Sequence, residues 1–194
     1  MPFLLLKYAK KYAHKIAKNM RLEIKMYKPK MKNYNLDFRS LTDRDKTDQL
    51  VIHHTGDGID DDLSAEDIHK IHLANGWAGI GYHYVIRKDG TIEIGRPVDC
   101  IGAHAEGENN HTIGIHLSGN FEIGEPTDAQ IESTATLIAW LCQEYDIDIN
   151  SNNVVGHKDL PAPAGETACP GKNLYSQLET IRGKAMWYQL NYVN

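Results

Sequence analysis

Short apolar strands separated by helical segments determine which folds are open to this chain. Three segments rich in β-branched residues are typical of buried strands: residues 50–54, 113–117 and 154–155. Asp89-Gly90 is a two-residue hairpin signal between strands predicted at residues 82–87 and 91–94. Strands that alternate with helices, together with one hairpin, predict an α/β domain with a central mixed β-sheet flanked by helices.

Capping residues mark where the helices begin. A helix over residues 64–76 and a longer helix from Thr127 each start with a capping box, in which two side chains three positions apart satisfy free backbone amides. A last helix is predicted to begin at residues 171–172 and to end near residues 183–184.

Length and charge predict one acidic domain with a basic extension. The chain has 194 residues, which suits a single domain with a sizeable core. Residues 1–34 carry a net charge of +9, and the remainder, with 11 basic and 25 acidic groups, carries −14. We therefore predict a basic N-terminal arm over residues 1–34, a folded domain over residues 35–184 and a C-terminal tail over residues 185–194. The acidic domain argues against a nucleic-acid partner.

The basic arm has two interpretations. Residues 4–18 have the composition of a basic amphipathic helix that lies on anionic lipid or wall polymer. A disordered arm or upstream extension is favoured, because the stretch that begins at Met31 resembles the natural N-terminus of a protein. The apolar run at residues 3–6 is too short for a secretory signal, and no stretch approaches the ~20 apolar residues of a membrane span. We therefore expect a protein made in the cytoplasm, with no signal peptide and no membrane span.

The cysteines do not form a disulfide framework, because the three of them, Cys100, Cys142 and Cys169, are odd in number and widely spaced. Unpaired cysteines are typical of a protein in a reducing compartment, or of a protein in which a thiol binds a metal. Cys100 and Cys142 are interpreted as small buried hydrophobic residues.

Metal-binding side chains occur where predicted strands and loops end. His53 closes the first strand, His157 directly follows the last strand, and Cys169 precedes the last helix. A helix N-terminus lowers the pKa of a nearby thiol, which favours the thiolate that binds metal. Two imidazoles and one thiolate would leave the fourth position of a tetrahedral zinc ion open, as in catalytic sites. The gaps between these residues match no compact zinc finger, so on spacing alone buried core histidines are favoured over a zinc site.

Four groups of motifs occur together and in order along the chain. They are Val51-Ile52-His53-His54-Thr55, Gly81-Tyr82-His83-Tyr84 with Asp89-Gly90-Thr91, Thr112-Ile113-Gly114-Ile115 with Gly119-Asn120-Phe121, and Gly156-His157 with Thr167-Ala168-Cys169-Pro170-Gly171. The ordered set resembles the N-acetylmuramoyl-L-alanine amidase family of the phage-lysozyme and peptidoglycan-recognition-protein type. The resemblance covers about residues 38–182. It implies the fold of that family and a zinc amidase catalytic domain at residues 35–184.

The resemblance implies roles for individual residues. His53, His157 and Cys169 match the zinc ligands of the family. Tyr82 matches a catalytic tyrosine whose hydroxyl reaches the zinc-bound water or the scissile carbonyl. Thr167 stands where phage-type members carry a lysine and recognition proteins carry a threonine. A hydroxyl at this position can hydrogen-bond an oxyanion but brings no charge.

His116 is a third candidate catalytic residue. It follows the Ile-Gly-Ile run at the position where the cytosolic recycling branch of the family carries a catalytic glutamate. An imidazole that titrates near neutrality is suited to act as a general acid or base. The alternative is a strand residue that faces solvent or forms hydrogen bonds in the core.

Other imidazole and aromatic side chains are candidates for substrate binding. His104 lies in a loop where members of the family contact the glycan–peptide substrate, and His54 is expected beside the metal site. Trp77 either walls the cleft or is a buried aromatic residue. His69 and His72 are interpreted as a polar helix face.

The resemblance implies a hydrolase that cleaves the amide between N-acetylmuramic acid and L-alanine in peptidoglycan. Its cofactor would be Zn²⁺ and its partner peptidoglycan or a muropeptide. A monomeric phage or prophage endolysin that acts on the cell wall after release is the favoured setting. The alternatives are a non-catalytic peptidoglycan-recognition module, a cytosolic muropeptide-recycling amidase and a zinc peptidase that cuts within the stem peptide.

Overall fold

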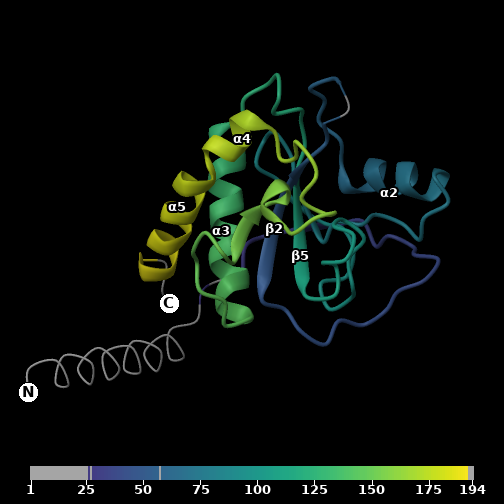
Figure 1. The fold of residues 1–194 in the computed structure, drawn as a ribbon, viewed down its shortest axis with the longest axis horizontal. Helices are drawn as coiled ribbons and strands as arrows, with labels where there is room; N and C mark the ends of the chain where they lie inside the picture. The colour runs from purple at the N-terminus through teal and green to yellow at the C-terminus, as the bar shows by residue number, and fades with distance from the viewer. Residues whose placement is uncertain (1–25, 27, 57, 192–194) are drawn as a thin grey trace, which may run out of the picture.

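A six-stranded sheet forms the centre of the computed structural model (Figure 1). The structure describes residues 26, 28–56 and 58–191. The strand order is β1-β4-β3-β5-β2-β6. The strands are β1 (Lys32–Asn33), β2 (Gln49–His54), β3 (Tyr84–Ile86), β4 (Ile92–Ile94), β5 (Thr112–Leu117) and β6 (Val154–Gly156). β3 and β4 pair antiparallel, and every other neighbouring pair is parallel. The predicted mixed sheet is confirmed.

Helices cover both faces of this sheet (Figure 1). α3 (Asp128–Glu144) and α5 (Leu178–Asn191) pack together on one face, and the shorter α4 (Lys172–Ser176) precedes α5. α2 (Ala65–Ala74) lies on the other face, where its apolar side packs against Ile80 and Val85. Within the described part of the chain, every helix falls short of the length and apolar content needed to cross a membrane.

Side-chain alternation along β2 determines which way the first histidine points. Leu50 and Ile52 belong to the large core with α3 and α5, whereas Val51 belongs to a separate cluster on the opposite face. Because successive side chains of a strand point to opposite faces, His53 shares the face of Val51.

Both predicted capping boxes are confirmed, at Ser64 before α2 and at Thr127 before α3. The predicted hairpin between β3 and β4 is also confirmed, but its turn has three residues instead of two. The Arg87 amide donates to the Thr91 carbonyl at 3.0 Å, and Gly90 adopts φ 84°, a left-handed value that glycine reaches without strain.

Ordered elements extend past both predicted domain boundaries, at 35 and at 184. The last helix continues to Asn191 because Ala185 is buried in the core against α3, so residues 185–191 are not a tail. β1 pairs with β4, and Met26 is buried in the same core, so the sheet takes in part of the predicted arm. The amphipathic helix considered for residues 4–18 lies outside the described residues.

Candidate metal centre

Adjacent parallel strands bring the two candidate metal-binding histidines together. β2 and β6 are neighbours, with Ile52 opposite Gly156. His53 is next along β2, and His157 begins the short 3-10 helix η1 (His157–Asp159) that directly follows β6. Strands of the same direction end at the same edge of a sheet, which places both imidazoles at its carboxyl edge. Their ring centroids are 4.5 Å apart.

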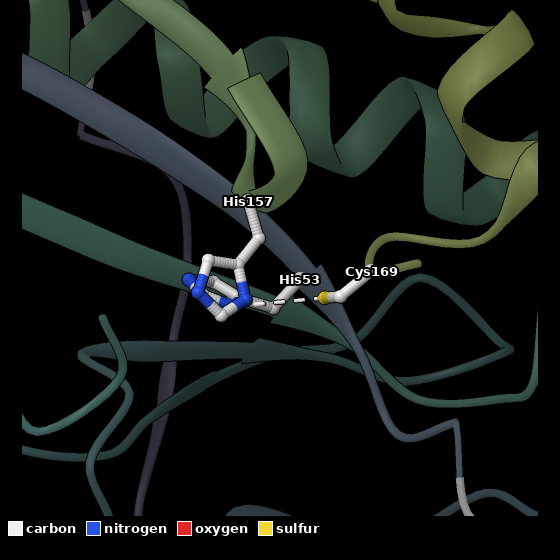
Figure 2. Close-up of side chains that lie close together, drawn as sticks. All are labelled: His53, His157 and Cys169. Atoms are coloured by element: carbon white, nitrogen blue, oxygen red, sulfur yellow. Dashed lines mark hydrogen bonds between the residues drawn. The ribbon is translucent and has the colours of Figure 1, made fainter. Parts of the chain in front are cut away.

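Cys169 completes the cluster from the loop before α4. The three side chains converge on one point, as Figure 2 shows. One ligand atom from each lies within 4.8 Å of the others, and Cys169 Sγ is 3.7 Å from His53 Nδ1. Two ligands of one tetrahedral zinc ion, each about 2.0–2.3 Å from the metal, lie roughly 3.3–3.6 Å apart. The donor set and its spacing therefore fit a zinc ion.

Burial keeps the cluster uncharged in the metal-free protein. It lowers the pKa of His157, and it lowers the pKa of His53 well below the usual histidine value. Burial also raises the pKa of the Cys169 thiol to about 12. The expectation that a helix N-terminus lowers this pKa is wrong, because α4 begins only at Lys172, has five residues and does not offset desolvation.

The cluster opens onto a cleft of about 390 Å³, which Tyr82 and Thr167 also line. The ring of Tyr82 lies 5.1 Å from that of His53, and burial raises the pKa of the Tyr82 phenol, so the hydroxyl keeps its proton. Thr167 Oγ1 accepts a hydrogen bond from the Cys169 amide at 3.1 Å. Its own proton therefore stays available to a group in the cleft.

His116 is buried directly behind Tyr82. The two rings are 4.6 Å apart, and His116 Nε2 lies 3.2 Å from the hydroxyl of Thr55, which lines the cleft. Burial lowers the pKa of His116 to about 3. The expectation of titration near neutrality is therefore wrong, and so is the alternative of a side chain that faces solvent. His116 Nδ1 has no hydrogen-bond partner among the described residues.

The three candidate substrate-binding residues have different surroundings. His54 lines the cleft, and its Nδ1 accepts a hydrogen bond from the Phe121 amide at 3.1 Å. His104 is buried beneath the cleft instead of lining it, because its ring packs against that of His53. Trp77 is not the buried aromatic residue considered from the sequence, since its side chain is 52% exposed.

Two further residues differ from the sequence-based interpretation. His69 is not part of a polar helix face: it is buried, its Nδ1 accepts from the Ile80 amide, and its Nε2 donates to the Asp37 carbonyl. Glu122 lines the cleft with no role predicted for it, and its Oε1 accepts from the Lys172 amide at 2.9 Å. Its place directly after Gly119-Asn120-Phe121 is the signal that could have identified it.

The fold and the cluster define a class: single-domain α/β proteins with a His-His-Cys group in a cleft at the carboxyl edge of a mixed sheet. A sequence model of the N-acetylmuramoyl-L-alanine amidase family matches residues 43–172. The chain belongs to that family.

Individual relatives agree with this assignment. An endolysin of Klebsiella phage KP32 is 33% identical over 138 residues, which cover 69% of this chain and 86% of the relative. Peptidoglycan-recognition protein SC2 of Drosophila melanogaster is 32% identical over 136 residues, or 67% of this chain and 71% of the relative. Among solved structures, the N-acetylmuramoyl-L-alanine amidase LysC from Clostridium intestinale is 36% identical with a TM-score of 0.71, covering 81% of this chain and 97% of LysC.

Proposed function

We propose that this chain is a zinc-dependent amidase that cleaves the amide between N-acetylmuramic acid and L-alanine in peptidoglycan. The observation that carries the proposal is the convergence of His53, His157 and Cys169 on a cleft that also holds Tyr82 and Thr167. Similarity to phage endolysins and to the amidase LysC supports peptidoglycan as the substrate.

The cluster and the two hydroxyl groups have complementary chemistry. A zinc ion held by the three ligands would polarise the amide carbonyl and lower the pKa of its water to about 7. Tyr82 keeps its proton, so its hydroxyl can donate to the carbonyl oxygen as negative charge develops there. Thr167 is placed to offer a second donor, because its oxygen already accepts from the Cys169 amide and its proton is free to turn into the cleft.

His116 contributes indirectly in this proposal. Its ring is buried and neutral, and it meets the cleft through Thr55 on one side and Tyr82 on the other. We assign it the tasks of holding the Tyr82 ring and of accepting a hydrogen bond from Thr55, which fixes the orientation of that hydroxyl at the edge of the cleft.

Substrate contacts are assigned to His54 and Trp77. His54 lines the cleft beside the cluster. The exposed ring of Trp77 packs edge-on against His72 at 4.7 Å, and His72 lies 6.0 Å from Tyr82. An exposed aromatic ring near the cleft suits packing against a sugar face.

The biological setting that fits best is a phage or prophage endolysin. Relatives of this description come from Klebsiella and Escherichia phages. In this setting the protein acts as a monomer on the cell wall after release from the cytoplasm. A non-catalytic recognition module is disfavoured because Cys169 completes the ligand set, and a cytosolic recycling amidase remains the second candidate.

Digestion of purified cell walls by the full chain tests the activity. Mass spectrometry of the products should reveal new L-alanine amino termini, which disappear with EDTA and return with added zinc. New D-amino-acid termini would indicate a peptidase instead. Binding to walls without any new terminus, by protein that carries zinc, would indicate a recognition module.

A further inference from the structure

The metal-binding histidine of β2 makes a second contact on the side away from the cluster. His53 Nδ1 faces Cys169 Sγ at 3.7 Å, while His53 Nε2 lies 3.0 Å from His104 Nδ1. Both histidines are buried. A metal-binding imidazole commonly donates its other N–H to a partner that fixes the ring. In this structure the partner is itself a histidine.

Hydrogen-bond direction follows from the requirement that His53 Nδ1 be unprotonated to bind a metal. A neutral imidazole then carries its proton on Nε2, so His53 donates and His104 Nδ1 accepts. His104 must in turn carry its proton on Nε2, which lies 3.4 Å from Thr112 Oγ1. The Thr112 hydroxyl donates to the Glu108 carbonyl at 2.8 Å. Each link has one donor and one acceptor, and the chain ends on the backbone.

The space for His104 is built into the surrounding backbone. A Cβ added to Gly102 or Gly114 would come within 2.5 Å of the His104 ring. The amide oxygen of Asn109 accepts from the backbone amides of His104 and Ala105, at 2.8 and 3.0 Å. Two glycines and one amide side chain therefore hold the imidazole where it meets His53.

We propose that His104 is a positioning residue for the metal centre. It holds His53 in the tautomer and ring orientation that present Nδ1 to the metal, and Thr112 holds His104 in the matching tautomer. The inference rests on the proposed function only in requiring that the cluster binds zinc, and it does not depend on which bond is cleaved. It replaces the substrate contact expected for His104.

Zinc affinity, measured by competition with a chromophoric chelator, is the test. His104→Leu removes the acceptor, and we expect zinc to bind about 10–100-fold more weakly. His104→Asn places an amide oxygen near the position of Nδ1 and should recover part of the lost affinity. Thr112→Val should weaken binding less than His104→Leu, whereas Thr112→Ser should match wild type.

His69→Leu is the matched control, because His69 is another buried histidine with both ring nitrogens hydrogen-bonded. It should lower the melting temperature and leave zinc affinity unchanged. The visible absorption of the cobalt(II) protein gives a second readout, and His104→Leu should shift it.

Wild-type zinc affinity and an unchanged cobalt spectrum in folded His104→Leu would overturn the inference. If that variant does not fold, wild-type affinity in both His104→Asn and Thr112→Val would overturn it equally. Zinc that binds tightly to a chain with no amidase products would contradict the proposed function alone. Failure of the wild-type chain to bind zinc would overturn both.

Discussion

At the residue scale, burial determines which groups around the cleft can carry or give up a proton. The Tyr82 hydroxyl stays protonated and can donate, whereas His116 behind it stays neutral because burial lowers its pKa to about 3. The identity of the cluster residues could be predicted, because each stands in a short ordered motif. Their ionisation could not, because desolvation depends on chain segments far away in the sequence.

Removal of the Tyr82 hydroxyl tests its assigned role. Tyr82→Phe keeps the ring that packs against His53 and His116, and it removes only a donor to the developing oxyanion. We expect kcat on purified peptidoglycan to fall roughly 10²–10³-fold while zinc content is unchanged. Tyr84→Phe is the control, since that ring is buried in the core on the other face. Equal activity of the two variants would remove Tyr82 from the mechanism.

At the scale of elements, local sequence signals predicted where the helices start. They did not predict contacts between segments that are far apart in the sequence. The capping boxes at Ser64 and Thr127 involve residues three positions apart, so the sequence displays them directly. β1 could not be predicted, because a lysine-rich segment joins the sheet only through its pairing with β4 about 60 residues later. The contact between His104 and His53 spans 51 residues and escaped for the same reason.

The cap of α3 gives an element-scale prediction. Thr127 Oγ1 accepts from the Gln130 amide at 3.1 Å and donates to the Lys88 carbonyl at 2.7 Å, so it ties the helix to the hairpin. Thr127→Ala should lower the free energy of unfolding by about 1–2 kcal/mol, as measured by urea denaturation. Thr127→Ser retains both hydrogen bonds and should lose much less. Zinc affinity should stay the same in both variants, because the cap is remote from the cluster.

At the scale of the whole molecule, the fold buries several neutral histidines on one side of the sheet. Burial lowers the pKa of His83 and of His116 to about 3, and it lowers the pKa of His104 well below the usual value. The unfolded chain binds protons at these side chains below about pH 6.5, while the folded protein does not. These histidines therefore cost no stability above that pH and destabilise the folded protein progressively below it.

Acid should destabilise the metal-free protein steeply. Between about pH 6.5 and pH 3, His83 and His116 each remove about 1.4 kcal/mol of unfolding free energy per pH unit as the pH falls. Urea unfolding at a series of pH values measures this slope. His116→Gln should make the slope shallower by about 1.4 kcal/mol per pH unit, because one fewer proton is taken up on unfolding. A slope that is the same with and without His116 would contradict the assigned neutral state.

His111, directly before β5, has a raised pKa and therefore changes stability with pH in the opposite direction to the buried histidines. Burial alone would lower its pKa, but hydrogen bonds to Glu108 at 2.9 Å and to Asp48 at 2.6 Å outweigh burial and raise it. Its contribution is present below the unfolded pKa of about 6.5 and is lost as the pH rises through the raised folded value. His111→Gln should therefore cost less stability at pH 9 than at pH 6.

X-ray absorption at the zinc edge tests the central claim most directly, because it reports the ligands of the metal in the full chain. We expect one sulfur at about 2.3 Å and nitrogen or oxygen ligands, two of them imidazoles, at about 2.0–2.1 Å. Cys169→Ala should lose the sulfur shell and the amidase products together. A wild-type zinc spectrum without sulfur, or amidase activity that survives in Cys169→Ala, would contradict the account.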